Sequence, residues 1–288
     1  MKAASCGAVR ALRAGRGFTL VELAVVLFIV GLILGSMMFT LSAQVEQSNR
    51  AETLRRLDSA KELLLAFAIV NGRLPCPAIC TDPPICSAGG VEAGVAGVCT
   101  NSYGGFLPAV TIGYQQVDAR GYAVDAWGNR LRYAVAPHAT NPDGSTGCSS
   151  PVKPASFTNA TNLKASTNGV NCAPLNIVVC DAVQNTSDAD PGNLPPTCGT
   201  WAVLGDARQV TNQRTVVAVV FSTGKNTPPP PSICATCTDE NANTDNNGVF
   251  VYHEPRPTGA QGGEYDDQMV WIPAGLLYGK LIAAGVLP

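Results

Sequence analysis

The sequence carries little charge and few histidines, and it lacks the motifs that mark common enzymes. Only 14% of its 288 residues are charged, and the formal net charge is -2. Such a balance disfavours nucleic acid as a partner. His138 and His253 stand far apart and outside any H-E-x-x-H pattern, and neither a G-x-S-x-G elbow nor a Walker loop occurs. We therefore predict a protein that is not an enzyme, with no catalytic residues, no metal and no cofactor.

Cysteine, in contrast, is plentiful, with 11 residues in the chain. Disulfides persist in oxidising compartments, so this many cysteines beside a hydrophobic N-terminal segment predict a location outside the cytoplasm. Cys6 precedes the apolar segment and stands apart from the others. The remaining cysteines form an even set of disulfide candidates whose connectivity is not readable from their spacing: Cys76, Cys80, Cys86, Cys99, Cys148, Cys172, Cys180, Cys198, Cys234 and Cys237.

Residues 18–41 form an almost unbroken apolar run, FTLVELAVVLFIVGLILGSMMFTL. The flank before it carries Lys2, Arg10, Arg13 and Arg16 and no acidic residue. At ~1.5 Å rise per residue the run would reach roughly 36 Å as a helix, enough to cross a hydrocarbon core of ~30 Å. Because a basic flank stays cytoplasmic, the pattern predicts one membrane span, with the rest of the chain on the far side.

One acidic side chain, Glu22, interrupts this run. A carboxylate in hydrocarbon costs on the order of 2 to 3 kcal/mol, and no Lys, Arg or His occurs between Phe18 and Arg50. Cleavage between Gly17 and Phe18 would create an α-amino group four residues before Glu22, on the same helical face. We therefore predict that this amine neutralises the carboxylate, either within one chain or between neighbouring chains.

Residues 17–22, GFTLVE, ahead of the apolar run resemble the cleavage and methylation motif of type IV pilins and type II secretion pseudopilins. The resemblance implies that a prepilin peptidase cuts after Gly17 and methylates Phe18, and that Glu22 is the assembly residue. It also implies the partners, namely other pilin or pseudopilin subunits, the peptidase, the inner-membrane assembly platform and membrane lipid. A secretory signal cut near Ala43 is the alternative, which the run disfavours because signal cores have about 7 to 15 apolar residues.

The rest of the chain predicts an α+β fold. Residues 42–72 continue the helical pattern in amphipathic form, with Leu54, Leu57, Leu64 and Phe67 at helical spacing. After residue 72, Gly, Pro and Asn favour loops and short strands. We expect the helix to pack on a mainly antiparallel sheet in a disulfide-stapled head, with a short C-terminal helix after the last strand. The expected strands are Leu131–Ala136, Leu175–Cys180, Thr215–Ser222, Val249–Tyr252 and Met269–Ile272.

The predicted organisation is therefore a removed leader at 1–17, a membrane or filament-core helix at 18–41, its amphipathic continuation at 42–72 and a globular head at 73–288. Residues 125–133, DAWGNRLRY, are similar to the stretch that enters the first strand of pseudopilins, and we interpret them as structure.

An Asp- and Asn-rich stretch, residues 239–248, offers the oxygen ligands that calcium prefers. It fails EF-hand spacing because Thr244 and Phe250 stand where Gly and Glu belong. A solvated polar loop is the favoured interpretation, and calcium stays an alternative there and at Asp266 and Asp267.

The predicted function is a structural subunit, a minor pilin or pseudopilin-like protein that assembles through its N-terminal helix into a type IV pilus or a type II secretion pseudopilus. The length of the chain and the position of Cys237, well before the C-terminus, depart from major pilins and favour the minor role. The predicted location is the bacterial inner membrane with the head in the periplasm, followed by the filament and the cell surface. The alternative is a membrane-anchored periplasmic binding protein that does not polymerise.

Overall fold

The computed structural model describes residues 19–83, 86–87, 89–95, 97–136, 157–160, 163, 177–182, 198, 209–211, 215–225, 238–257, 259–260 and 263–287, apart from the side chains of 34 and 36–43. The chain divides into two compact units, Met1–Ser48 and Asn49–Pro288. The first contains the start of helix α1, and the second contains the end of α1 and the head.

Helix α1 spans Leu20–Asn71. Its second half is rich in Ala, Leu, Glu and Arg, which are strong helix formers. The helix ends where Gly72 adopts φ of 66°, a left-handed conformation that glycine takes without strain, and the Gly72 N–H donates to the Ala68 carbonyl at 2.8 Å. The predicted end of the helix is thus confirmed to within a residue.

The second half of α1 packs one stripe into the head. Leu57, Ala60, Leu64 and Ala68 are fully buried at helical spacing, and each leucine stabilises the fold by roughly 1.5–3 kcal/mol. The expected place of Leu54 in this stripe is wrong, because Leu54 is 42% exposed and its neighbour Thr53 is buried instead.

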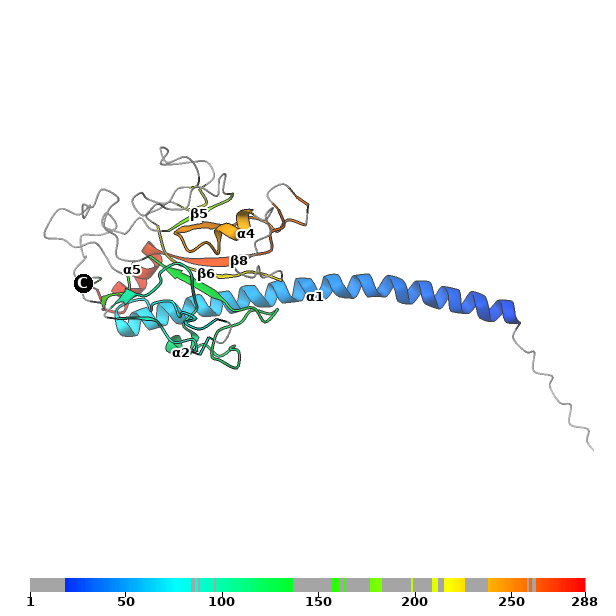
Figure 1. Cartoon of the computed structure of the whole chain (residues 1–288), viewed down its shortest axis with the longest axis horizontal. Coiled ribbons are helices and arrows are strands. Elements are labelled where there is room, and N and C mark those ends of the chain that lie inside the picture. The colour runs from blue at the N-terminus through cyan, green and yellow to red at the C-terminus, as the bar shows by residue number, and fades with distance from the viewer. Residues whose placement is uncertain are drawn as a thin grey trace, which may run out of the picture. The chain divides into compact units, whose positions relative to one another are not determined.

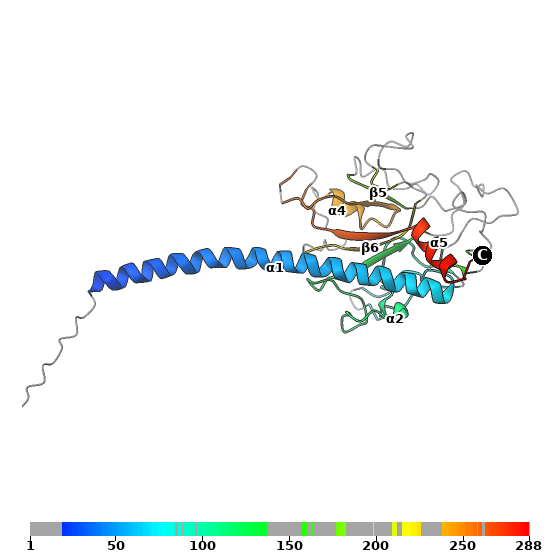
Figure 2. The same ribbon diagram turned by 180° about the vertical axis from the view of Figure 1, so that it is seen from behind.

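The core of the head is a four-stranded antiparallel sheet in the order β3-β4-β6-β8. Its strands are β3 (Gly105–Phe106), β4 (Arg132–Val135), β6 (Val216–Ser222) and β8 (Gln268–Pro273). Every residue of β6 is buried, as befits a central strand with both faces covered. Figures 1 and 2 show β6 and β8 on one side of the second half of α1 and the short helix α2 (Ala109–Ile112) on the other.

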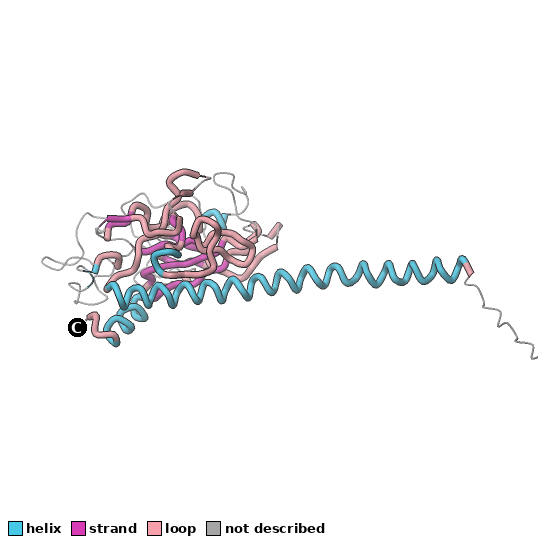
Figure 3. Tube along the Cα trace, turned by 90° about the horizontal axis from the view of Figure 1, so that it is seen from below, coloured by secondary structure: helices cyan, strands magenta, loops and turns pink. Residues whose placement is uncertain are grey.

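Smaller elements complete the head. Strand β5 (Val178–Cys180) pairs in parallel with β7 (Val249–Val251), and β1 (Gly94–Val95) forms a hairpin with β2 (Val98–Cys99). Helix α4 covers Thr238–Ala242, and α5 covers Ala274–Ala283 (Figure 3). All five expected strands are present, four of them shortened and the last extended by one residue at each end, and the expected α+β class and C-terminal helix are confirmed.

Three disulfides lie within the described residues: Cys76–Cys99, Cys80–Cys86 and Cys180–Cys198. They confirm six of the expected cysteines and supply the pairing that spacing left open. The expected disulfide residues Cys148, Cys172, Cys234 and Cys237 lie outside the described residues.

Candidate functional site

Thr19 and Glu22 cap the N-terminus of α1. The backbone N–H and the hydroxyl of Thr19 both donate to Oε2 of Glu22, each at 2.9 Å, and the Glu22 N–H donates back to the Thr19 hydroxyl at 3.3 Å. This reciprocal arrangement is a capping box, which satisfies backbone N–H groups that have no partner within a helix. The Glu22 carboxylate is therefore held in place by its own chain.

Sequence reasoning named Glu22 but overlooked Thr19, although a Thr-x-x-Glu spacing before an apolar run is the usual signature of this cap. The two predicted processing residues, Gly17 and Phe18, lie outside the described residues. Since α1 begins at Leu20, the prediction that Phe18 and Glu22 share a helical face stays untested.

Beyond the cap, α1 presents apolar side chains in every direction. All residues from Leu20 to Ile33 are exposed, with Leu20 at 85% and Phe28 at 69%. Among the residues that the structure describes, no helix combines the length and the hydropathy that crossing a membrane requires.

The 125–133 stretch forms the expected turn into a strand and docks it on α1. Asp125 is 1% exposed, and its Oδ1 accepts hydrogen bonds from the backbone N–H groups of Trp127 and Asn129 at 2.9 and 2.8 Å. Its Oδ2 accepts the Ser222 hydroxyl of β6 at 2.6 Å. Burial raises the pKa of Asp125, while these hydrogen bonds oppose the shift.

The same turn is tied to the helix by side chains of α1. Arg56 donates to the carbonyl oxygens of Val124 and Asp125 at 3.1 and 2.6 Å, and the Thr53 hydroxyl accepts the Ala126 N–H at 3.2 Å. The last contact explains why Thr53, and not Leu54, is buried. The turn is therefore a structural joint between α1 and the sheet.

Three buried carboxylates meet near the start of β8. Oxygens of Glu240, Asp266 and Asp267 lie within 4.8 Å of one another. The Asp266 N–H donates to Oε1 of Glu240 at 3.0 Å, and Oδ2 of Asp267 accepts from the side chain of Asn243 at 2.7 Å, while its Oδ1 accepts no hydrogen bond from the described part of the chain. Burial, reinforced by the two neighbouring carboxylates, raises the pKa of Asp267 well above its usual value. Such a set of oxygens can hold a divalent cation or share a proton.

The expectation of a solvated loop at 239–248 is wrong for part of this stretch. Asp239, Glu240 and Asn243 are 2%, 2% and 3% exposed, because helix α4 and the turn that follows it direct them inward. Asp239 accepts from Arg256 at 3.1 Å and lies 3.1 Å from Nε2 of His253, so it faces a different set of residues from Glu240. The stretch therefore contributes one carboxylate to the cluster instead of enclosing an ion by itself.

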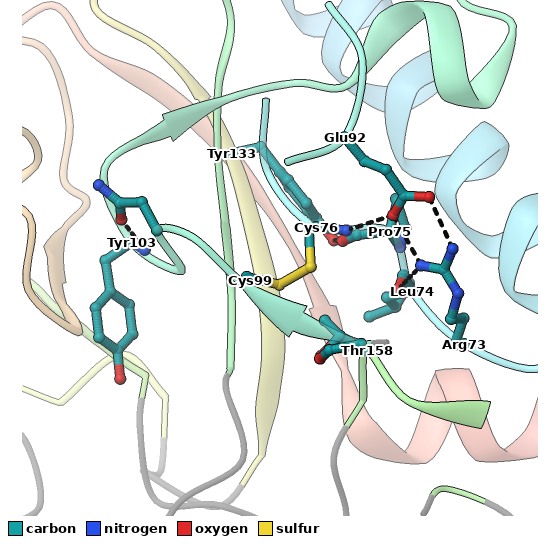
Figure 4. The surroundings of a disulfide bond; sticks show 11 residues. Arg73, Leu74, Pro75, Cys76, Glu92, Cys99, Tyr103, Tyr133 and Thr158 are labelled. Carbon is teal, nitrogen blue, oxygen red and sulfur yellow. Dashed lines mark hydrogen bonds and ion pairs between the residues drawn. A yellow bond between two sulfur atoms is a disulfide. The ribbon is translucent and has the colours of Figure 1, made fainter. Parts of the chain in front are cut away.

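A cavity of about 370 Å³ lies beside the Cys76–Cys99 disulfide (Figure 4). On its wall, Arg73 donates to both carboxylate oxygens of Glu92 at 2.8 and 2.7 Å, and Oε2 of Glu92 also accepts the Cys76 N–H at 3.1 Å. The guanidinium holds the pKa of Glu92 below its usual value. The ion pair and the disulfide therefore tie Arg73, Glu92 and Cys76 into one wall of the cavity.

Comparison with known proteins bears on the N-terminus. Residues 12–38, about a tenth of the chain, match a family model described as the prokaryotic N-terminal methylation motif. No curated protein and no solved structure matches the chain. The match confirms that the chain carries the prepilin-type motif of type IV pilins and pseudopilins.

Proposed function

We propose that the chain is a minor pilin or pseudopilin-like subunit that is cut after Gly17, methylated at Phe18 and assembled through residues 18–41 into a type IV pilus or a type II secretion pseudopilus. One observation carries the proposal: the methylation motif stands at the start of a helix whose described residues from Leu20 to Ile33 are apolar on all sides, apart from Glu22, and wholly exposed.

An apolar surface that is exposed on all sides of a helix is stable only when lipid or protein buries it. Removing a Val, Leu, Ile or Phe side chain from water is worth roughly 1.5–3 kcal/mol, and a helix that is apolar all round becomes stable only when it is buried all round. Lipid of the inner membrane provides that cover before assembly. In a filament, several copies of the same helix provide it, with the prepilin peptidase and the assembly platform as earlier partners.

Glu22 fits burial among the helices of a filament better than burial in membrane lipid. A carboxylate gains nothing from lipid, whereas in a bundle of helices it can meet the amine that cleavage creates at Phe18 of a neighbouring subunit. The contact fixes the register of one subunit against the next. The disulfide-stapled head then faces the periplasm or the cell exterior as a structural and not a catalytic domain.

Cell fractionation tests the proposal. The cells express the full chain together with its peptidase and assembly platform. Mechanical shearing followed by high-speed centrifugation of the supernatant should bring a substantial share of the processed chain into the filament pellet. A chain that stays wholly with the membranes, while another subunit of the same machine is recovered in the pellet as a control, would instead identify a tethered periplasmic binding protein.

A further inference from the structure

The capping box at the start of α1 occupies only one half of the Glu22 carboxylate. Oε2 takes both Thr19 hydrogen bonds, and Oε1 receives none from the residues that the structure describes. The Thr19 hydroxyl serves Glu22 twice, since it donates to Oε2 and accepts the Glu22 N–H at 3.3 Å. One of the two hydrogen bonds that hold Oε2 therefore comes from a small side chain, while the other comes from the Thr19 backbone N–H and is kept whatever side chain stands there.

We infer that Thr19 is a positioning residue for filament assembly, which holds Glu22 so that Oε1 is left for the amine of a neighbouring subunit. The inference rests on the proposed function. A free Glu side chain samples many rotamers, and fixing one of them at the moment of contact costs conformational entropy. The hydroxyl of Thr19, together with the backbone N–H of the same residue, restricts the carboxylate in advance, before the neighbouring subunit arrives.

A simpler role for Thr19 would be capping alone. A residue that only caps the helix can be replaced by Asp, which is at least as good an N-cap because its oxygen accepts the same N–H. Asp, however, cannot donate to Oε2, and its charge repels the Glu22 carboxylate. Substitution by Asp therefore separates capping from positioning.

The experiment compares Thr19→Val, Thr19→Ser and Thr19→Asp in the full chain, expressed with its peptidase and assembly platform. The readout is the share of processed chain in sheared filaments, with the N-terminal mass measured for every variant. Thr19→Val, which keeps the branched shape without the hydroxyl, should lower that share roughly tenfold, as the loss of a hydrogen bond to a charged group implies. Thr19→Ser should stay within about twofold of the parent, and Thr19→Asp should fall with Thr19→Val.

Parental assembly by Thr19→Val or by Thr19→Asp would overturn the inference. So would a Thr19→Val chain that is never cut, because the hydroxyl would then serve recognition by the peptidase. Should Thr19→Asp itself not be cut, Thr19→Gly takes its place, because glycine is well tolerated at an N-cap but has no hydroxyl that could donate to Oε2. Glu22→Ala serves as the reference. If the Glu22→Ala chain assembles normally, the proposed function fails. If Glu22→Ala abolishes assembly while Thr19→Val assembles normally, only the positioning role is refuted.

Discussion

Glu22→Ala is expected to remove the chain from sheared filaments almost completely, by at least about a hundredfold relative to the parent. In the assembled state the carboxylate and a neighbouring amine are both out of water. Taking away one partner of such a pair leaves an uncompensated buried charge, at a cost of about 3–5 kcal/mol. Since ~1.4 kcal/mol corresponds to a factor of ten, the expected loss spans two powers of ten or more. Quantitative immunoblots of the sheared and cell-bound fractions measure it.

Glu62→Ala is the matched control, because Glu62 is also on α1 but is exposed on the part that belongs to the head. It should assemble within about twofold of the parent, as surface substitutions usually change stability by no more than ~0.5 kcal/mol. Recovery of Glu22→Ala in filaments at the level of Glu62→Ala would show that the carboxylate has no part in assembly.

Asp125→Ala is expected to destabilise the head by about 3–5 kcal/mol, the largest loss that we predict for a single side chain there. The carboxylate accepts two backbone N–H groups of its turn and the Ser222 hydroxyl, and all three donors would be left in a buried site. Urea denaturation of residues 49–288, the second compact unit, with disulfides intact measures the change.

Two further variants calibrate this prediction. Asp125→Asn keeps an oxygen for the backbone N–H groups and can turn its NH₂ toward the Ser222 hydroxyl, so it should lose less than half as much stability. Asp58→Ala removes an exposed carboxylate of α1 and should change stability by no more than ~0.5 kcal/mol. If the Asp125→Ala head were as stable as the Asp58→Ala head, the 125–133 turn would not be a structural joint between α1 and the sheet.

Local patterns predicted much of the fold, because they depend on neighbours in the chain. The first six residues of β6, all buried, form a continuous apolar run, and the helical spacing of Leu57 and Leu64 predicted the face of α1 that packs. Leu54 was misplaced because the Ala126 N–H, 73 residues away, donates a hydrogen bond to the Thr53 hydroxyl, so that Thr53 and not Leu54 faces the head. Periodicity carries no information about such a contact.

The parts that could not be predicted join segments remote in sequence. The parallel pair of β5 and β7 and the meeting of Glu240 with Asp266 and Asp267 both require the folded chain, and disulfide connectivity does too. The candidate site, in contrast, lies within one short stretch of the sequence. The methylation motif could be recognised because it is a contiguous stretch, whereas the assembly role of Glu22 stays a prediction. The Thr19 cap could also have been predicted from the Thr-x-x-Glu spacing.

Mass spectrometry of the N-terminus of the chain, purified from cells that contain its peptidase, tests the central claim most directly. The account predicts a chain that begins at Phe18 and carries one methyl group on its α-amine. A chain that retains residues 1–17, or one trimmed near Ala43, would contradict it, because no amine would then stand beside Glu22.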